Sequence, residues 1–207
     1  MDLIRKYFPE LTPDQLSKFE KLGQIYYQWN RKINVISRQD ITHFHERHLL
    51  HSLAVAKAFR FPGQSRILDV GTGGGLPGIP LAVYFPECSF MLIDSIGKKI
   101  NVVRAVIGEL GLDNVQSMQI RAEDYQEKFH YIVARAVTDL SKFKKWVTKN
   151  VDIKDIKDPV NGVIYLKGGD LAEEVKPYRN ARVYNISDFF EEEYFVTKKL
   201  IYIPVSN

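Results

Sequence analysis

The residues best suited to chemistry form a dense glycine run, Leu68-Asp69-Val70-Gly71-Thr72-Gly73-Gly74-Gly75-Leu76-Pro77-Gly78. Glycine lets a backbone turn sharply and approach a ligand where a Cβ would clash. A helix that begins after such a run offers unpaired N–H groups and the positive end of its dipole to a ligand. The run therefore predicts a loop between a strand and a helix that binds a cofactor.

Two cofactor classes compete for this loop, because its glycines satisfy two spacings. Gly73, Gly75 and Gly78 fit the G-x-G-x-x-G spacing of dinucleotide sites. Gly71, Gly73 and Gly75 fit the tighter G-x-G-x-G spacing of S-adenosylmethionine enzymes. Asp69 favours the second class, because an acid just before the loop can hold the methionine ammonium group, directly or through water, and would repel a pyrophosphate. An ordinary glycine turn without a ligand is the third alternative.

Two acidic positions follow later strands of the expected sheet. Asp94 ends the second strand, nineteen residues after Gly75, where an acid grips ribose hydroxyls in nucleotide sites. That contact does not separate the two cofactors, since both carry a ribose. Ala122-Glu123-Asp124 follows the third strand, where a backbone amide or an acid can pair with an adenine edge. For Glu123 the competing interpretation is a place beside a helix N-cap.

Alternating strands and helices position these residues. Helices are expected between the first five of seven strands, which are Ile67–Val70, Phe90–Ile93, Val115–Ile120, Tyr131–Ala134, Val163–Leu166, Arg182–Ile186 and Lys199–Val205. Two helical stripes run through Ile96, Ile100, Val103, Ile107 and Leu110, and through Leu140, Phe143 and Val147. This order predicts an α/β fold: a Rossmann-like, seven-stranded, mostly parallel sheet with helices on both faces. Ligands of such sheets bind at the carboxyl ends of the strands.

A basic N-terminal segment precedes the sheet. Thr12-Pro13-Asp14-Gln15 predicts a helix start with a capping box, and a second helix is expected from near Asp40 to Phe59. Residues 1–66 hold eleven Lys and Arg against six Asp and Glu, whereas residues 67–207 hold eighteen against nineteen. We therefore expect a helical, RNA-facing extension over 1–65 and a cofactor-binding domain over 66–207. The asymmetry suggests a polyanionic partner, or else a basic face without one. The expected phosphate contacts are Arg31, Lys32, Arg38 and Arg47.

Histidines and aromatic residues of the extension leave several interpretations open. His45, His48 and His51 recur at i, i+3 and i+6, so they share one helical face. They could bind zinc, contact RNA or pack against the sheet domain. No H-E-x-x-H pattern or acidic partner supports zinc, so we expect no metal. Trp29 and the Tyr26–Tyr27 pair could stack on bases, but their helical spacing favours the core.

The chain resembles the bacterial glucose-inhibited-division B family over nearly its whole length. The motifs that carry the resemblance are Trp29-Asn30-Arg31-Lys32-Ile33-Asn34, Arg47-His48-Leu49-Leu50-His51-Ser52-Leu53, the glycine run with its tail Ile79-Pro80, Asp94-Ser95-Ile96-Gly97-Lys98-Lys99, Arg121-Ala122-Glu123, Ala134-Arg135-Ala136 and Leu166-Lys167-Gly168. That family methylates 16S rRNA at guanine N7. The resemblance therefore implies a class I methyltransferase that uses S-adenosylmethionine, with 16S rRNA or the small ribosomal subunit as its partner.

The same resemblance implies which residues touch the cofactor. These are Gly71, Leu76, Ala122, Glu123 and Arg135, and we add Ser95 and Ile96, which follow Asp94 in its motif. One departure from the family is His51, which stands where many relatives carry Asp.

The residues after the fourth strand, Ala134-Arg135-Ala136-Val137, bear on which atom is methylated. Enzymes that methylate exocyclic amines usually carry Asn or Asp, two prolines and an aromatic residue there, and this chain does not. Methylation at C5 of cytosine needs a cysteine nucleophile, and Cys88 precedes the second strand, at the wrong end. Guanine N7 fits both absences, because its free lone pair needs no general base and positioning can supply most of the rate. We therefore expect no acid–base catalyst. Arg135 is expected to bind the cofactor carboxylate, the guanine or a phosphate, or to form only a surface salt bridge.

Composition narrows the setting and the rival functions. Cys88 is the single cysteine, so no internal disulfide can form, and a reducing cytoplasm fits best. The sequence has no apolar run of about eighteen residues, and its first residues lack the apolar stretch of a secretory signal. A monomeric cytoplasmic protein is therefore expected. The rivals are an NAD-dependent oxidoreductase and a non-catalytic RNA-binding module that retains a cofactor fold.

Overall fold

The computed structural model describes residues 1–37 and 39–205, and a seven-stranded sheet runs through its centre. Its strands are β1 (Arg66–Val70), β2 (Ser89–Asp94), β3 (Val115–Gln119), β4 (Tyr131–Arg135), β5 (Gly162–Gly168), β6 (Arg182–Asn185) and β7 (Lys198–Pro204). Their spatial order is β3-β2-β1-β4-β5-β7-β6. Neighbours from β3 to β5 pair in parallel, whereas β7 runs antiparallel to β5 and β6. The predicted Rossmann-like, mostly parallel sheet is confirmed.

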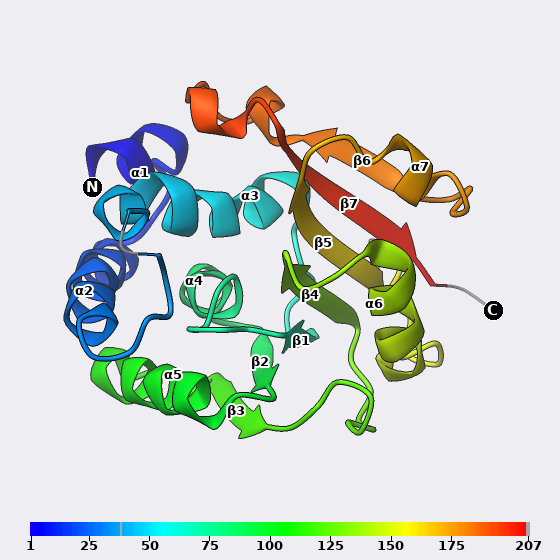
Figure 1. The fold of residues 1–207 in the computed structure, drawn as a ribbon, viewed down its shortest axis with the longest axis horizontal. Helices are drawn as coiled ribbons and strands as arrows, with labels where there is room; N and C mark the ends of the chain where they lie inside the picture. Colours follow the sequence, from blue (N-terminus) through cyan, green and yellow to red (C-terminus); the bar gives the residue numbers. More distant parts are fainter. Residues whose placement is uncertain (38, 206–207) are drawn as a thin grey trace.

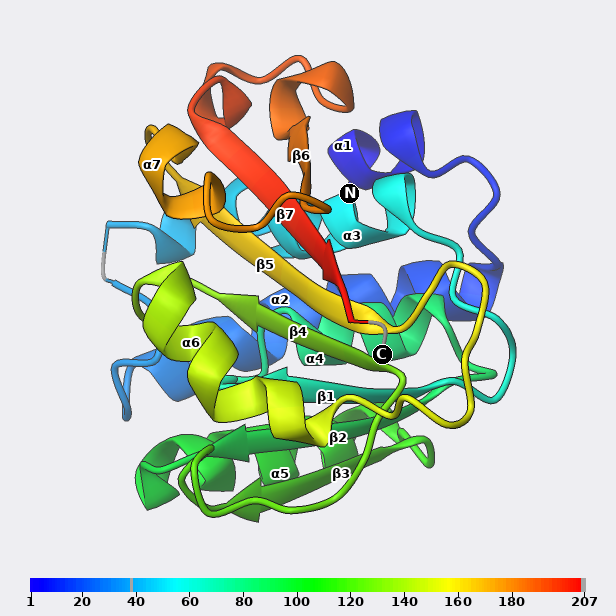
Figure 2. The same cartoon turned by 90° about the vertical axis from the view of Figure 1, so that its right-hand side faces the viewer.

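Helices cover both faces of this sheet (Figure 1). One face carries α4 (Gly78–Tyr84), α5 (Gly97–Leu110) and the helices of the extension, α1 (Asp2–Tyr7), α2 (Pro13–Asn30) and α3 (His51–Ala58). The other face carries α6 (Leu140–Val147) and α7 (Ala172–Val175), and Figure 2 shows α6 in front of the sheet with α2 and α4 behind it. Short 3-10 turns complete the chain: η1 (Ile41–His43), η3 (Thr148–Asn150), η4 (Ile186–Asp188) and η5 (Glu193–Phe195). Among the described residues, no helix is both long and apolar enough to cross a membrane.

The extension packs against the sheet domain and shares its core. Helix α2 begins with the predicted capping box, in which the amides of Thr12 and Gln15 each donate to the other residue's side chain. Its buried face consists of Phe19, Leu22, Ile25 and Tyr26. These four side chains belong to the same apolar cluster as α4, α5 and one face of the sheet. Burying each contributes about 1.5–3 kcal/mol, so the extension is an integral part of the fold.

The second helix of the extension changes type along its length. The predicted helix from Asp40 to Phe59 is present as η1, then a π-helix, η2 (Phe44–Leu50), and then α3. A π-helix pairs residues five apart, so it rotates the side chains that follow relative to an α-helix. Single π turns occur often at functional sites. This one carries Arg47 and His48.

The connection between β3 and β4 differs from the prediction. The sequence predicts a helix there, but residues 120–130 form turns and loop, with an isolated bridge between Phe129 and Val151. A helical crossover between parallel strands needs about a dozen residues or more, and this segment is shorter. Tyr125 and Phe129 are buried in it, with ring centroids 6.0 Å apart, and they cover the part of the sheet face that a helix would cover.

Candidate cofactor site

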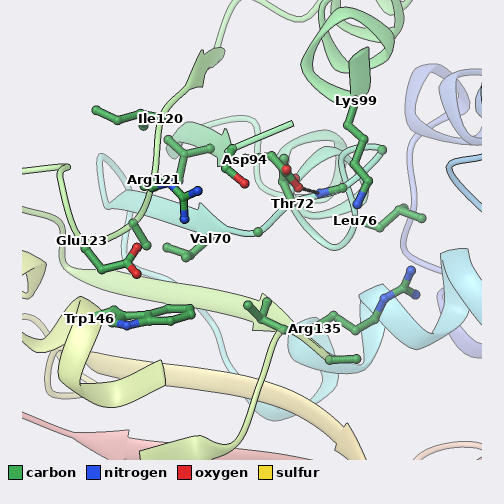
Figure 3. A pocket seen from close by; sticks show the side chains of 18 of the residues that line it. Val70, Thr72, Leu76, Asp94, Lys99, Ile120, Arg121, Glu123, Arg135 and Trp146 are labelled. Carbon is green, nitrogen blue, oxygen red and sulfur yellow. Dashed lines mark hydrogen bonds between the residues drawn. The ribbon is translucent and has the colours of Figure 1, made fainter. Parts of the chain in front are cut away.

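A cavity of about 550 Å³ lies at the carboxyl ends of the parallel strands. Figure 3 shows Glu123 and Trp146 toward one end of it, Leu76 and Arg135 toward the other, and Asp94 between them. The predicted cofactor residues that line it are Gly71, Gly73, Leu76, Asp94, Ser95, Ala122, Glu123 and Arg135. The remaining three, Asp69, Gly75 and Ile96, are not part of the lining. They support residues of the lining through contacts within the protein.

The glycine loop follows the cavity wall in a left-handed backbone conformation. Gly71 and Gly73 have φ angles of 67° and 60°. The amides of Gly71 and Thr72 donate to the Ile93 carbonyl at 2.9 and 3.0 Å, which ties the loop to the end of β2. At Gly75 a Cβ would lie 2.4 Å from Ile79 Cδ1. Gly75 therefore allows α4 to pack closely under the loop, which is a structural role rather than contact with a ligand.

Asp69 lies beneath the loop and is fully buried. Its Oδ2 accepts hydrogen bonds from Thr72 Oγ1 at 2.6 Å and from the Gly78 amide at 2.8 Å. Its Oδ1 is buried with no hydrogen-bond partner among the described residues. Burial raises the pKa of this carboxyl to about 7. Asp69 therefore fastens the loop to the start of α4. Of the two predicted routes to a ligand, direct or through water, only the indirect one fits this placement.

Asp94 presents its carboxylate to the middle of the cavity. The side chain is 7% exposed, and its two oxygens accept from the Gly73 and Ile96 amides at 2.9 Å each. A carboxylate oxygen can accept more than one hydrogen bond, so both remain able to bind ribose hydroxyls. Ile96 takes part through its amide alone. This placement agrees with the ribose contact expected of Asp94.

Several lining residues were not predicted from the sequence. They are Val35 from the extension, Lys99 from α5, Arg121 after β3, and Lys142 and Trp146 from α6. Lys142 and Trp146 are four residues apart, and Lys142 Nζ lies 5.4 Å from the Trp146 ring. That spacing puts both on one helical face, which is the only signal the sequence offered. A tryptophan in an amphipathic helix is otherwise expected in the core.

Arg135 lies at the end of the cavity next to the extension. Its Nη2 is 3.1 Å from His48 Nδ1 and its Nη1 is 3.5 Å from the Arg47 carbonyl oxygen. Among the described residues, no carboxylate lies within 4.0 Å of the guanidinium. The surface salt bridge considered for Arg135 is therefore not found in the described part of the chain. A half-buried cation without a counter-charge suits an anionic ligand.

The predicted phosphate contacts of the extension fall into different settings. Arg31 and Lys32 are exposed at the end of α2, and Lys32 Nζ lies 5.3 Å from the Trp29 ring. Arg47 is engaged within the protein, because it pairs with Asp40 at 2.8 Å and stands over the Tyr194 ring. Arg38 lies outside the described residues. Arg31 and Lys32 are therefore the members of this set best placed for a polyanion.

The histidines of the extension pack against other parts of the protein. His51 is buried against Tyr194 and Phe195, and neither of its ring nitrogens has a partner in the described part of the chain. Burial lowers the pKa of His51 well below its usual value. Within residues 1–37 and 39–205, no three His, Cys, Asp or Glu side chains are grouped to hold a metal. Tyr26 is buried whereas Tyr27 is 58% exposed, so the aromatic pair is divided between core and surface.

Comparison with known proteins identifies the family. The family described as GidB, rRNA small subunit methyltransferase G, matches residues 15–197. The ribosomal RNA small subunit methyltransferase G of Christiangramia forsetii is 51% identical over 99% of this chain and 97% of its own length. That of Cytophaga hutchinsonii is 50% identical over 99% of both chains.

A solved structure, MtNAS in complex with MTA and tNA, is similar in fold alone. Its TM-score is 0.60 at 16% identity, and the match covers 99% of this chain and 75% of that one. At full-length identity near one half, the sequence relatives show more than a shared fold. The chain belongs to the rRNA small subunit methyltransferase G family and is an S-adenosylmethionine-dependent methyltransferase.

Proposed function

We propose that this protein transfers the methyl group of S-adenosylmethionine to N7 of a guanine in 16S RNA of the small ribosomal subunit. The observation that carries the proposal is the cavity at the carboxyl edge of the sheet. A buried carboxylate, Asp94, and the guanidinium of Arg135, which has no carboxylate partner among the described residues, both line this cavity. The description of the family as rRNA small subunit methyltransferases indicates that the substrate is RNA of the small ribosomal subunit. The choice of N7 comes from the chemistry of the residues that follow β4.

The residues along the cavity suit the parts of the cofactor in order. Ala122 and Glu123 stand where an adenine edge would pair, and Asp94 stands where ribose hydroxyls would donate. Arg135 would take the carboxylate of the methionine part, and Asp69 would act on the ammonium group through Thr72 or water. When bound, the cofactor supplies an electrophilic methyl group on a sulfonium.

The turn after β4 supports a reaction that depends on position rather than on proton transfer. Ala136 lines the cavity with a φ of 51°, which non-glycine residues rarely adopt. The hydroxyl of Tyr165 holds this turn, because it accepts from the Val137 and Thr138 amides at 2.9 Å each and donates to the Thr138 carbonyl at 2.6 Å. A strained turn that neighbouring groups keep in place is a frequent feature of active sites. Guanine N7 needs only such positioning, since it attacks with a free lone pair.

The RNA would reach the cavity across a basic surface. Lys99, Arg121 and Lys142 line the cavity. Arg31 and Lys32 are exposed on the extension, a few positions before Val35, which also lines the cavity. Lysine and arginine bind phosphates through charge and release counterions when they do so. The single thiol, Cys88, is buried and free, which suits a reducing cytoplasm.

A transfer assay tests the proposal. The purified chain is incubated with methyl-labelled S-adenosylmethionine and with 16S RNA, free or in small subunits, taken from a strain that lacks this methyltransferase. We expect the label to enter the RNA and to be recovered, after digestion to nucleosides, as N7-methylguanosine. Label recovered on an amine or a ribose would refute the N7 assignment. No transfer to either form of the RNA would refute the proposed substrate.

A further inference from the structure

One helix of the extension reaches the cofactor cavity through its contact with Arg135. Figure 3 shows the Arg135 side chain at the end of the cavity with its guanidinium directed toward that helix. Two atoms of the π-helix η2 meet it, the Arg47 carbonyl oxygen and His48 Nδ1. These groups are 87 or more positions away along the chain, so only the fold brings them together. Among the described residues, the remaining N–H donors of Arg135 have no acceptor, so they can bind an anion in the cavity.

The contact with His48 defines the state of its ring. A guanidinium only donates hydrogen bonds, so His48 Nδ1 must hold a lone pair and the ring must be neutral, with its proton on Nε2. Burial and the charge of Arg135 lower the pKa of His48 to about 3, which agrees with a neutral ring at physiological pH. His48 therefore acts on Arg135 as a fixed acceptor rather than as a second cation.

A continuous path of packed groups holds that acceptor still. The His48 ring stacks on Phe44 at 6.2 Å between centroids, and Phe44 in turn packs on Tyr26 at 5.1 Å. The Tyr26 hydroxyl donates to the Gly74 carbonyl in the glycine loop. The extension thus connects the two protein groups that flank the methionine end of the cavity, the loop and Arg135. Ring packing and hydrogen bonds of this kind restrict side-chain rotation, so Arg135 is aimed before any ligand arrives.

We propose that His48 is a positioning residue that aims Arg135 at the carboxylate of the cofactor's amino-acid part. The inference rests on the proposed function, since it assumes that the methionine part occupies the Arg135 end of the cavity. It assigns to the extension a share of cofactor affinity, in addition to the RNA contacts expected of it. His48 would act on a single carboxylate of the ligand. The effect of a His48 substitution can therefore be separated from a general loss of ligand binding.

Two ligands and two substitutions isolate that carboxylate. 5′-Methylthioadenosine has the nucleoside part of S-adenosylmethionine but lacks the amino-acid part. His48→Leu and His48→Asn have the same branching at Cγ, but only the asparagine places a hydrogen-bond acceptor where Nδ1 stood. His45→Leu is the matched control, because His45 belongs to the same π-helix and its ring lies against Gly23 and Phe44, with no hydrogen bond to Arg135 among the described residues. Calorimetry measures the Kd of both ligands for each protein, and a melting curve checks folding.

We expect His48→Leu to raise the Kd of S-adenosylmethionine about tenfold, since a hydrogen bond that holds a charged group in place is lost. The Kd of methylthioadenosine should change by less than about twofold, and His48→Asn should recover most of the loss. Equal weakening of both ligands, an asparagine variant as weak as the leucine variant, or a leucine variant that binds like wild type would each overturn the proposal. So would a loss of RNA affinity alone, which would make the anion a phosphate.

Two further outcomes are distinguishable from these. If His48→Leu does not fold, His48→Ala replaces it in the comparison with His48→Asn. The ratio of the Kd of S-adenosylmethionine to the Kd of methylthioadenosine then tests the proposal in the same way. A wild-type chain that binds S-adenosylmethionine but methylates no RNA would refute the proposed function, and the ratio would still support or overturn the role of His48.

Discussion

The glycine loop and the N-terminal extension meet the same cavity in different ways. The loop contributes backbone, and its partners Asp69, Ile93 and Asp94 come from the strands β1 and β2 that lead to the same edge of the sheet. The extension contributes single side chains from separate segments, among them Tyr26 and His48. A loop of this kind depends on the shape that its own residues adopt. The extension's contribution to cofactor binding depends on how well a distant helix is packed. Substitutions in the two regions should therefore have different effects.

The largest effect is expected on the loop side, at Asp94. Asp94→Ala should weaken S-adenosylmethionine binding by about 1.5–3 kcal/mol, because we expect its carboxylate to accept the ribose hydroxyls and because it holds the Gly73 amide. Calorimetry measures the loss. Asp124→Ala is the control, since Asp124 is exposed and does not line the cavity. An Asp94→Ala protein that binds within about twofold of wild type would remove Asp94 from the cofactor site.

The next effect belongs to the extension and concerns RNA. Replacing Arg31 and Lys32 by Glu should weaken RNA binding about tenfold at moderate salt and flatten its dependence on salt, because fewer counterions are released. S-Adenosylmethionine affinity should stay unchanged, since exposed charges are well screened. Arg179→Glu with Arg182→Glu is the matched control, because both are exposed near the start of β6, beside a different cavity. RNA affinity that is equal in the two double variants would end the claim that Arg31 and Lys32 face the substrate.

These two predictions also mark what the sequence could and could not reveal. The loop, Asp94 and the succession of strands along the chain were predictable, because their signals are local spacings of glycine, acids and branched apolar residues. The buried place of Asp69 was not, since an acid beside a loop looks the same whether it faces a ligand or the protein. The contact of His48 with Arg135 spans 87 positions and leaves no pattern in either segment. Trp146 was missed because its helical spacing is that of a core residue.

A smaller effect is expected at Tyr26, whose hydroxyl connects the extension to the glycine loop. Tyr26→Phe removes the hydroxyl that donates to the Gly74 carbonyl and leaves that buried acceptor without this partner. The free energy of unfolding should fall by about 1–2 kcal/mol, with a modest loss of cofactor affinity. Denaturant titration measures the first and calorimetry the second. Tyr27→Phe, one residue further along α2 and 58% exposed, should change neither. Equal effects of the two substitutions would show that Tyr26 does not support the loop.

An effect of similar size is expected in how stability depends on pH. The pKa of His48 is lowered to about 3 in the folded protein, whereas an unfolded histidine titrates near 6.5. The unfolded chain therefore binds more protons below about pH 6.5, and stability falls as the pH is lowered toward 3. His48→Asn removes this contribution, so from pH 7 to pH 5 it should lose about 1–2 kcal/mol less than wild type. Asp69 and His51 are present in both proteins and cancel in the comparison. Parallel pH profiles would contradict a neutral, half-buried His48.

The most direct test of the proposed activity maps the modification in cells. A bacterial strain that lacks its own enzyme of this family is given this chain or its Asp94→Ala variant, and its 16S rRNA is reduced and treated with aniline, which cleaves at N7-methylguanosine. We predict that the wild-type chain restores cleavage at a guanine of the 16S rRNA and that the variant restores little or none. A 16S rRNA that stays uncut, although the chain is expressed and binds S-adenosylmethionine, would contradict methyl transfer to guanine N7.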